Sequence, residues 1–160
     1  MGLGGYPESI VDVGAGAGEW RSYLGQIMPD AHWTAVEIWE PYIRRFNLET
    51  RYNQVHRADI REWPMQPADL YLFGDVLEHM PADDAVAVWD RARFVAHWLV
   101  ISLPVLPYPQ EAVNGNPYEA HVHQWDTASV LERFRGIIST AGPLEGSTVG
   151  AFIARGTERM

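Results

Sequence analysis

Short apolar runs recur along the chain, separated by stretches in which apolar residues return every three or four positions. Short runs of this kind are typical of strands buried in a sheet, and the period of three to four is typical of helices. The apolar runs lie at residues 9–13, 32–37, 52–56, 68–73 and 94–102. We therefore expect strands at these places, with helices after the first, second and fourth of them.

The first helix is predicted by an apolar stripe with the spacing of one helix face, which Pro29 then ends. The stripe consists of Trp20, Tyr23, Leu24, Ile27 and Met28. Pro41 is well placed to open a second helix through about Leu48. Pro81 precedes acidic residues that suit a first helical turn, and the apolar period continues from there to Ala92.

The last third of the chain has a different pattern. The segment from Leu103 to His123 contains four prolines and no regular period. Segments of this length without regular structure are usually functional or disordered in a compact domain. Asp126 or Thr127 can cap a helix that follows it. Residues 136–155 then have the pattern of two strands around 142–146, with no helix between them.

This order of elements predicts the fold. Strands that alternate with helices form a parallel sheet with right-handed crossovers, whereas two strands joined by a short turn pair antiparallel. We expect an α/β fold with a single doubly wound, mostly parallel sheet and a C-terminal antiparallel hairpin, formed by one domain over residues 1–160. Ligands of such sheets bind at the carboxyl ends of the strands, where the strand order reverses.

A glycine-rich turn separates the first strand from the first helix. Gly14, Gly16 and Gly18 allow the backbone to turn sharply and to approach a ligand closely. Such a turn also suits nicotinamide and flavin cofactors. The dinucleotide fingerprint, however, has its third glycine three positions after the second, where this chain has Glu19. A carboxylate there would face a pyrophosphate, so the spacing favours a ligand without phosphates.

Two acids follow strands at the same predicted edge. Glu37 ends the second strand, 19 residues after Gly18, which matches an acid that accepts hydrogen bonds from ribose hydroxyls. Asp59 follows the third strand and has two interpretations. It could accept a hydrogen bond from an adenine amino group, or it could cap a helix from Ile60 onward.

Together these residues resemble the class I methyltransferases that use S-adenosylmethionine. Residues 11–18 are similar to the first motif of that family, Glu37 to the acid that ends its second strand, and residues 58–60 to its adenine-contacting segment. Residues 74–80 are similar to the segment after its fourth strand, and the closing hairpin to its extra antiparallel strand. The resemblance implies a three-layer sandwich.

The resemblance also implies the cofactor, S-adenosyl-L-methionine, and the residues that hold it. Asp12 would interact with the methionine amino group, often through water, and Glu37 would hold the ribose. The implied cofactor-binding residues are Asp12, Gly14, Ala15, Gly16, Gly18, Glu37, Ile38, Asp59, Ile60, Gly74 and Asp75.

Methyl transfer is an in-line displacement, and alignment of the nucleophile with the methyl group can supply much of the acceleration. A hydroxyl nucleophile must also lose a proton, whereas an amine can need only positioning. The candidate catalytic residues are His79, His121 and His123. For His79 the alternative is a cap on the helix that begins after Pro81.

The segment 103–123 is predicted to form a roof over the substrate site, with His121 or His123 pointing into the pocket. The i, i+2 spacing of these histidines puts both on one side of an extended segment. Glu119 could join them around a metal ion, but all three lie in one short segment with no evident distant partner, so no metal is expected. Further candidates for the same wall are Tyr108 and Tyr118.

Charge and composition bear on partners. Twelve Lys and Arg against 21 Asp and Glu give a formal charge of −9, which is unfavourable for nucleic acid, since binding to it relies on clustered basic residues. No apolar run reaches the ~18 residues that a membrane span requires. Residues 1–7 lack the basic and apolar regions of a secretory signal. We expect a cytoplasmic protein with a small-molecule substrate, with no nucleic acid or membrane partner; a homodimer is compatible with the sequence.

The sequence therefore favours an S-adenosylmethionine-dependent methyltransferase that acts on an oxygen or nitrogen acceptor in a small molecule. A non-catalytic adenosyl-cofactor-binding or scaffolding protein is one alternative, because no residue is an unambiguous base. An NAD(P)-dependent reductase is another, and Glu19 disfavours it.

Overall fold

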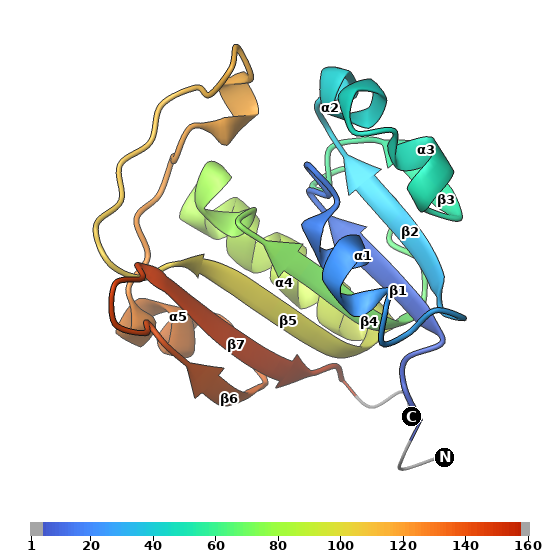
Figure 1. Cartoon of the computed structure of the whole chain (residues 1–160). Coiled ribbons are helices and arrows are strands. Elements are labelled where there is room, and N and C mark those ends of the chain that lie inside the picture. The colour runs from blue at the N-terminus through green and yellow to red at the C-terminus, as the bar shows by residue number, and fades with distance from the viewer. Residues whose placement is uncertain (1–4, 158–160) are drawn as a thin grey trace.

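In the computed structural model (Figure 1), which describes residues 5–157, helices separate most consecutive strands as far as residue 104, but none lies between residues 57 and 68. The strands are β1 (Ser9–Val13), β2 (His32–Glu37), β3 (Gln54–Arg57), β4 (Ala68–Gly74), β5 (Ala96–Pro104), β6 (Ile137–Ala141) and β7 (Val149–Arg155). The helices are α1 (Glu19–Leu24), α2 (Glu40–Arg45), α3 (Leu48–Arg51), α4 (Ala82–Val95) and α5 (Thr127–Arg133), with 3₁₀ turns at Leu77–His79 and Pro117–Glu119.

The strands form one sheet in the order β3-β2-β1-β4-β5-β7-β6. β1 to β5 pair in parallel, whereas β7 runs antiparallel to both β5 and β6. Strand order reverses between β1 and β4, which pair with Val13 opposite Phe73 at their carboxyl ends. The predicted doubly wound sheet and its C-terminal antiparallel hairpin are confirmed.

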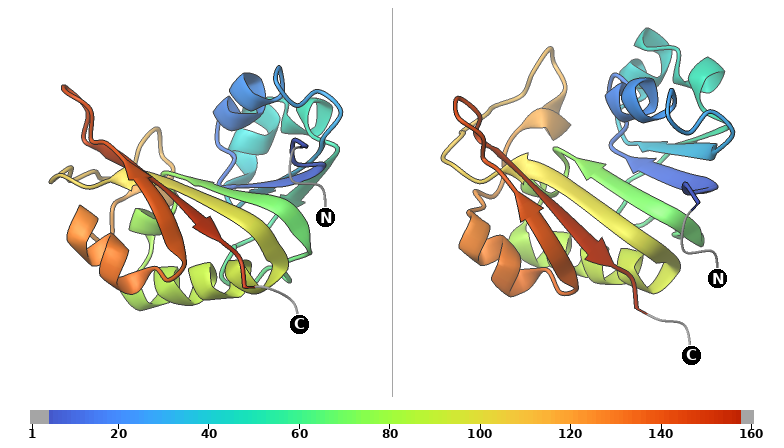
Figure 2. Two further views of the ribbon diagram at one scale, coloured as in Figure 1. Left: turned by 90° about the horizontal axis from the view of Figure 1, so that it is seen from below. Right: turned by 60° about the horizontal axis from the view of Figure 1, so that its bottom comes forward.

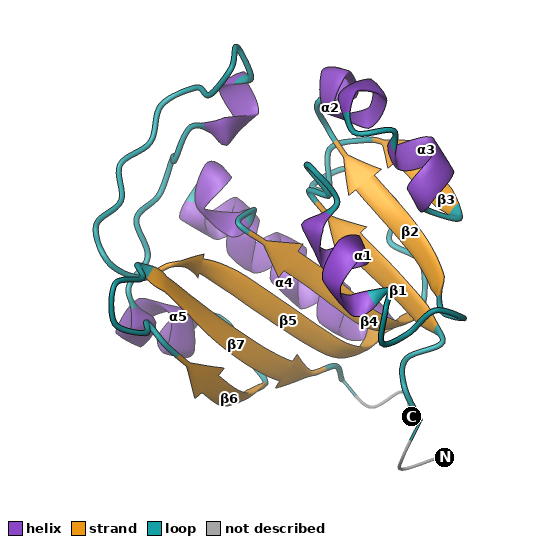
Figure 3. Ribbon diagram, in the orientation of Figure 1, coloured by secondary structure: helices purple, strands orange, loops and turns teal. Residues whose placement is uncertain are grey.

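Helices cover the sheet on both faces, with α1, α2 and α3 on one side and α4 and α5 on the other (Figures 2 and 3). Side chains alternate across each strand, so Ile10 packs toward the first group of helices and Val11 toward the second. A fully buried tryptophan lies in each core, Trp33 in the first and Trp89 in the second. The three-layer sandwich is confirmed.

The first helix is shorter than its apolar stripe predicts. α1 ends at Leu24 and is followed by Gly25, which is a poor helix former. Met28 still packs into the core, but Tyr23 and Ile27 are 68% and 53% exposed. The prediction that these two side chains belong to the buried face is therefore wrong.

The helix predicted from Pro41 to Leu48 is divided into α2 and α3. Asn47 has a φ of 51° between them, a left-handed conformation that asparagine tolerates better than most residues. β3 begins after the predicted start at Tyr52, because Tyr52 N still donates a hydrogen bond of 2.9 Å to the Leu48 carbonyl oxygen and so ends α3. β5 likewise begins at Ala96, since α4 continues through Val95.

The predicted helix cap at Asp126 is confirmed. Its Oδ1 accepts a hydrogen bond of 2.7 Å from Ser129 N, and Ser129 Oγ accepts one of 3.0 Å from Asp126 N. This capping box starts α5 directly after the long loop, which runs beyond the sheet and returns (Figure 3). Within residues 5–157, no helix has the length and apolar character needed to cross a membrane. The prediction that residues 1–7 are not a secretory signal rests partly on residues 1–4, which lie outside the described residues.

Candidate active site

A cleft of about 660 Å³, its mouth included, opens at the carboxyl ends of β1, β2 and β4. Its lining comes from the turn after β1, the end of β2, the segments that follow β3 and β4, and the long loop. The cleft therefore lies at the reversal of strand order, where ligands bind in folds of this class.

The glycine turn forms the floor of this cleft. Gly14, Gly16 and Gly18 have φ values of 63°, 50° and 70°, a region that side chains other than glycine adopt at a cost. A Cβ on Gly14 would lie 2.5 Å from Val76 Cγ2, whereas one on Gly16 would meet only the Gly14 carbonyl oxygen, at 3.7 Å. The turn thus needs glycine for its backbone, and at Gly14 and Gly18 also for space, since a Cβ on Gly18 would lie 2.8 Å from the Arg51 guanidinium.

Glu37 joins the end of β2 to the glycine turn. Its Oε2 accepts a hydrogen bond of 2.9 Å from Gly16 N, and its Oε1 accepts one of 2.7 Å from Trp39 N. The carboxyl group is buried, which raises its pKa above the ordinary value, while the two backbone hydrogen bonds oppose that rise. The predicted acid is therefore a fixed acceptor in the floor of the cleft.

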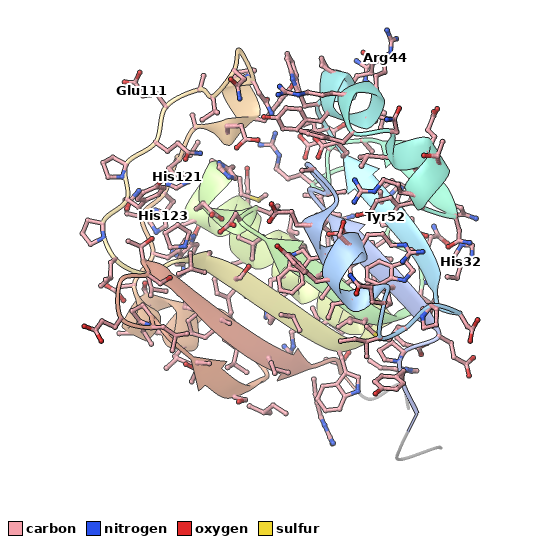
Figure 4. The ribbon with its side chains drawn as sticks, viewed as in Figure 1. His32, Arg44, Tyr52, Glu111, His121 and His123 are labelled. Carbon is pink, nitrogen blue, oxygen red and sulfur yellow. The ribbon has the colours of Figure 1, made fainter. Side chains whose placement is uncertain are left out.

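Asp12 lies beneath the turn on β1. Its Oδ2 accepts a hydrogen bond of 2.6 Å from the Tyr52 hydroxyl (labelled in Figure 4), and its Oδ1 has no partner among the described residues. Burial raises the pKa of Asp12 to about 7, and the hydrogen bond from Tyr52 limits the rise. Asp12 does not line the cleft directly.

The far wall contains Ile38, Asp59 and Ile60. The Asp59 carboxylate binds Arg61 through both oxygens and also accepts a hydrogen bond of 2.9 Å from Arg61 N. These hydrogen bonds hold the pKa of Asp59 below its usual value. Asp59 follows β3 and begins a single turn, in which its carbonyl oxygen accepts hydrogen bonds of 3.0 Å from Glu62 N and 2.8 Å from Trp63 N, but this turn does not continue into a helix.

Of the four other residues predicted to contact the cofactor, one lines the cleft and three lie behind its lining. Asp75 lines the cleft directly after β4. Ala15, Gly18 and Gly74 lie behind the lining: the Ala15 carbonyl oxygen accepts a hydrogen bond of 2.7 Å from Gly18 N. A side chain at Gly74 would collide with Trp20, so this glycine lets α1 pack over the sheet.

Arg51 supports the glycine turn, and the sequence patterns did not single it out. Its guanidinium donates hydrogen bonds of 2.6 Å to the Ala17 carbonyl oxygen and 2.7 Å to the Gly18 carbonyl oxygen. Arg51 lies at the end of α3, 33 residues after Gly18 in the chain. No local motif signals a contact at this separation.

The long loop contributes Asn116, Tyr118 and Glu119 to the cleft wall. Asn116 is buried and its Oδ1 accepts a hydrogen bond of 3.0 Å from Tyr118 N. The Tyr118 ring lies 6.0 Å from the Trp39 ring, measured between centroids, which brings the loop to the end of β2. Tyr108 does not line the cleft.

The three candidate histidines have different surroundings. His79 lines the cleft, and its ring lies 5.0 Å from that of His121, which does not line it. The His123 ring packs on Trp125 instead, 4.5 Å away between centroids. Both histidines lie on the returning limb of the long loop (Figure 4), but of their two rings it is that of His121 that lies against the ring of His79 after β4.

Glu78 is a buried acid that sequence reasoning missed. The side chain is 1% exposed, and neither carboxyl oxygen has a partner within residues 5–157. Burial raises the pKa of Glu78 to about 8. One donor atom from each of Glu78, His79 and His121 lies within 4.8 Å of the others. The distant partner that the loop histidines lacked in the sequence is thus provided by the fold.

The family follows from the sequence match. A family model described as a methyltransferase domain matches residues 10–97, which are 88 of the 160 residues. The chain belongs to this methyltransferase family, and the prediction of a class I methyltransferase is confirmed. The alternative of an NAD(P)-dependent reductase receives no support. A search of curated proteins by sequence finds no match.

Solved structures with a similar fold include several methyltransferases. Human N-acetylserotonin methyltransferase, in complex with SAM, has a TM-score of 0.69 at 18% identity, and the match covers 93% of this chain and 47% of that one. The mitomycin 7-O-methyltransferase has a TM-score of 0.68 at 17% identity, with 93% and 49% covered. The 1,6-didemethyltoxoflavin-N1-methyltransferase of Burkholderia thailandensis, with bound 1,6-didemethyltoxoflavin and S-adenosylhomocysteine, has a TM-score of 0.70 at 18% identity. That match covers 95% of this chain and 72% of the other. The chain spans about half the length of the first two.

Proposed function

We propose that the chain is an S-adenosylmethionine-dependent methyltransferase acting on an oxygen or nitrogen acceptor in a small molecule. One observation carries the proposal: the Glu37 carboxylate is hydrogen-bonded to Gly16 N in the floor of the cleft, at the reversal of strand order. Family membership supports the reaction class, and the substrates named for the similar structures support small acceptors.

The residues of the floor fit an adenosyl ligand. Gly16 has no side chain to occupy the cleft. The Glu37 carboxylate now accepts hydrogen bonds from two backbone amides, and the hydroxyls of a bound ribose could replace these amides as donors. Ile38 and Ile60 provide an apolar surface for an adenine ring, with Asp59 beside them. The unpartnered Asp12 Oδ1 is available to a water or an amino group under the turn. The bound cofactor would supply an electrophilic methyl group on a sulfonium sulfur.

His79 is the candidate base that the geometry favours. Its Nδ1 lies 3.1 Å from the Ala120 carbonyl oxygen. A carbonyl can only accept, so Nδ1 carries the proton and Nε2 keeps its lone pair. Burial holds the pKa of His79 below its usual value, which keeps the ring neutral near pH 7 and able to take a proton from a hydroxyl acceptor. His121 and His123 would act through the loop rather than from the lining.

Several properties of the whole protein belong to the same proposal. Residues 1–160 would form a single domain in the cytoplasm, and the net charge of −9 argues against a nucleic-acid partner. A homodimer is compatible with this reading, and light scattering of the purified chain tests it. A non-catalytic cofactor-binding protein would bind the same ligand without turnover.

Calorimetric titration of the full chain with S-adenosylhomocysteine tests the proposal. Glu37→Ala should weaken binding more than tenfold, since it removes a charge-assisted contact of about 1.5–3 kcal/mol. Glu40→Ala is the matched control, because this glutamate pairs with Arg44 and does not line the cleft. Its affinity should equal that of the wild type.

Equal affinity of the Glu37 and Glu40 variants would contradict the assigned site. Release of S-adenosylhomocysteine in the presence of hydroxyl and amine acceptors then separates the enzyme from a non-catalytic binding protein. A chain that binds the ligand and turns over no acceptor of either class supports the non-catalytic alternative.

A further inference from the structure

Three side chains from two distant segments converge beside the cleft. Glu78 and His79 belong to the 3₁₀ turn after β4, and His121 belongs to the returning limb of the long loop. One donor atom from each lies within 4.8 Å of the other two. Two imidazoles and a carboxylate form a donor set that first-row transition metals favour.

Both imidazoles are oriented by their other nitrogen. His79 Nδ1 donates to the Ala120 carbonyl oxygen at 3.1 Å, and His121 Nδ1 donates to the Tyr108 carbonyl oxygen at 2.6 Å. In each ring the lone pair is then left on Nε2. Metal-binding histidines almost always donate their second nitrogen to a carbonyl or carboxylate in this way, which fixes both tautomer and ring direction.

The backbone holds the two segments together before any ligand arrives. The Glu78 carbonyl oxygen accepts hydrogen bonds of 2.8 Å from Val122 N and 3.0 Å from His123 N. His121 N also donates to the Gln110 carbonyl oxygen at 2.9 Å, which joins the two limbs of the loop. The position of His121 relative to Glu78 is therefore fixed by main-chain contacts.

Glu78 is the independent sign of a ligand. Its carboxyl group is almost completely buried, and neither oxygen has a hydrogen-bond partner in the described part of the chain. Buried polar groups without partners are costly, and each one calls for an explanation. A cation between Glu78 and the two imidazoles would satisfy this acid.

We propose that Glu78, His79 and His121 form a binding site for a divalent first-row transition metal at the wall of the cleft. In the tetrahedral geometry that zinc prefers, donor atoms about 2.1 Å from the ion lie about 3.4 Å from one another. Donor atoms that lie within 4.8 Å of one another therefore need to approach by up to about 1.4 Å, a movement available to side chains. The site differs from a metal site at Glu119, His121 and His123, because the His123 ring packs on Trp125.

The metal site lies where a bound ion could act on the methyl acceptor, a role that rests on the proposed function. His79 also lines the cleft, so an ion bound to it would face an acceptor there. A metal ion lowers the pKa of a hydroxyl that binds it, which favours an acceptor with an oxygen donor over a simple amine. In that case His79 orients the acceptor through the ion instead of taking its proton.

Metal binding is measured directly on the tag-free full chain after removal of metals with a chelator. Calorimetry with Zn²⁺ should give about one ion per chain, and Co²⁺ should produce visible d–d absorption. Mg²⁺ should bind at least tenfold more weakly, because it disfavours imidazole ligands. His79→Ala, His121→Ala and Glu78→Gln should each weaken Zn²⁺ binding at least tenfold.

His123→Ala is the matched control, since it removes a neighbouring imidazole that contacts Trp125 rather than Glu78. It should retain wild-type Zn²⁺ affinity. Circular dichroism melts in chelator establish that each variant folds, and Glu78→Gln keeps the shape of the side chain if an alanine variant does not. Absence of a stoichiometric ion in the wild type, or equal affinity of Glu78→Gln and His123→Ala, would overturn the site.

Titration with S-adenosylhomocysteine in chelator separates this proposal from the preceding one. A chain that binds the adenosyl ligand but no Zn²⁺ loses only the metal site. A chain that binds Zn²⁺ but no adenosyl ligand loses the methyltransferase assignment and keeps the metal site.

Discussion

The floor of the cleft and the wall at His79 are built by different physical means. The floor consists of the glycine turn and Glu37, joined within 21 residues of sequence by the hydrogen bond from Gly16 N. The opposite wall brings His79 against His121 across a much longer separation and depends on the two hydrogen bonds that the Glu78 carbonyl oxygen accepts. The floor is therefore determined by local backbone conformation, and the other wall by the path of a loop.

This difference should appear most strongly in Gly14→Ala. The alanine would have to adopt the left-handed backbone conformation of Gly14, and its Cβ would lie 2.5 Å from Val76 Cγ2. Together these should lower the free energy of unfolding by about 2–5 kcal/mol and abolish binding of S-adenosylhomocysteine. Urea denaturation and calorimetry measure the two effects.

Gly115→Ala is the matched control in the long loop. Gly115 has a φ of 79°, but a Cβ there would meet nothing within 4 Å. Only the conformational cost of about 1–2 kcal/mol should remain, with adenosyl binding retained. Equal losses of stability and affinity in the two variants would show that space at the floor is not the determining factor.

A smaller effect is expected from the buried acid beneath the floor. The pKa of Asp12 rises from 3.8 to about 7 on folding, so the folded protein binds the proton more tightly. That stabilisation is complete below pH ~4 and is lost as pH rises to about 7, by at most about 4 kcal/mol. Asp12→Asn should lack this loss.

The measurement is the difference in unfolding free energy between wild type and Asp12→Asn across pH 4 to 8. The groups that act on Asp12 are Tyr52, Glu37 and Arg51, and they remain in both proteins. The stability of the wild type relative to the variant should fall between about pH 4 and 7 and then stay constant. A difference independent of pH would mean that folding does not raise the pKa of Asp12.

The sequence predicts the parts of the fold that depend on local pattern. The parallel part of the sheet follows from the strands and helices that succeed one another, the closing hairpin from two strands with no helix between them, and the cap at Asp126 from a short motif. The helix stripe fails at Tyr23 and Ile27, because Gly25 ends α1 before the stripe is complete.

The site divides in the same way. The glycine turn could be found from the sequence because few residues other than glycine adopt its backbone conformation. Glu37 could be found because it is an acid at the end of the strand that follows this turn. Arg51 and Glu78 could not be found. Arg51 reaches the turn across 33 residues, and the burial of Glu78 without a partner becomes visible only when the chain is folded.

The central claim is that the cleft binds an adenosyl ligand at its glycine floor. The most direct measurement is a calorimetric titration of the wild-type chain with S-adenosylhomocysteine and, separately, with NAD. The account predicts one S-adenosylhomocysteine per chain with a dissociation constant of about 1 μM, near −8 kcal/mol, and no binding of NAD. Binding of NAD without binding of S-adenosylhomocysteine would contradict it.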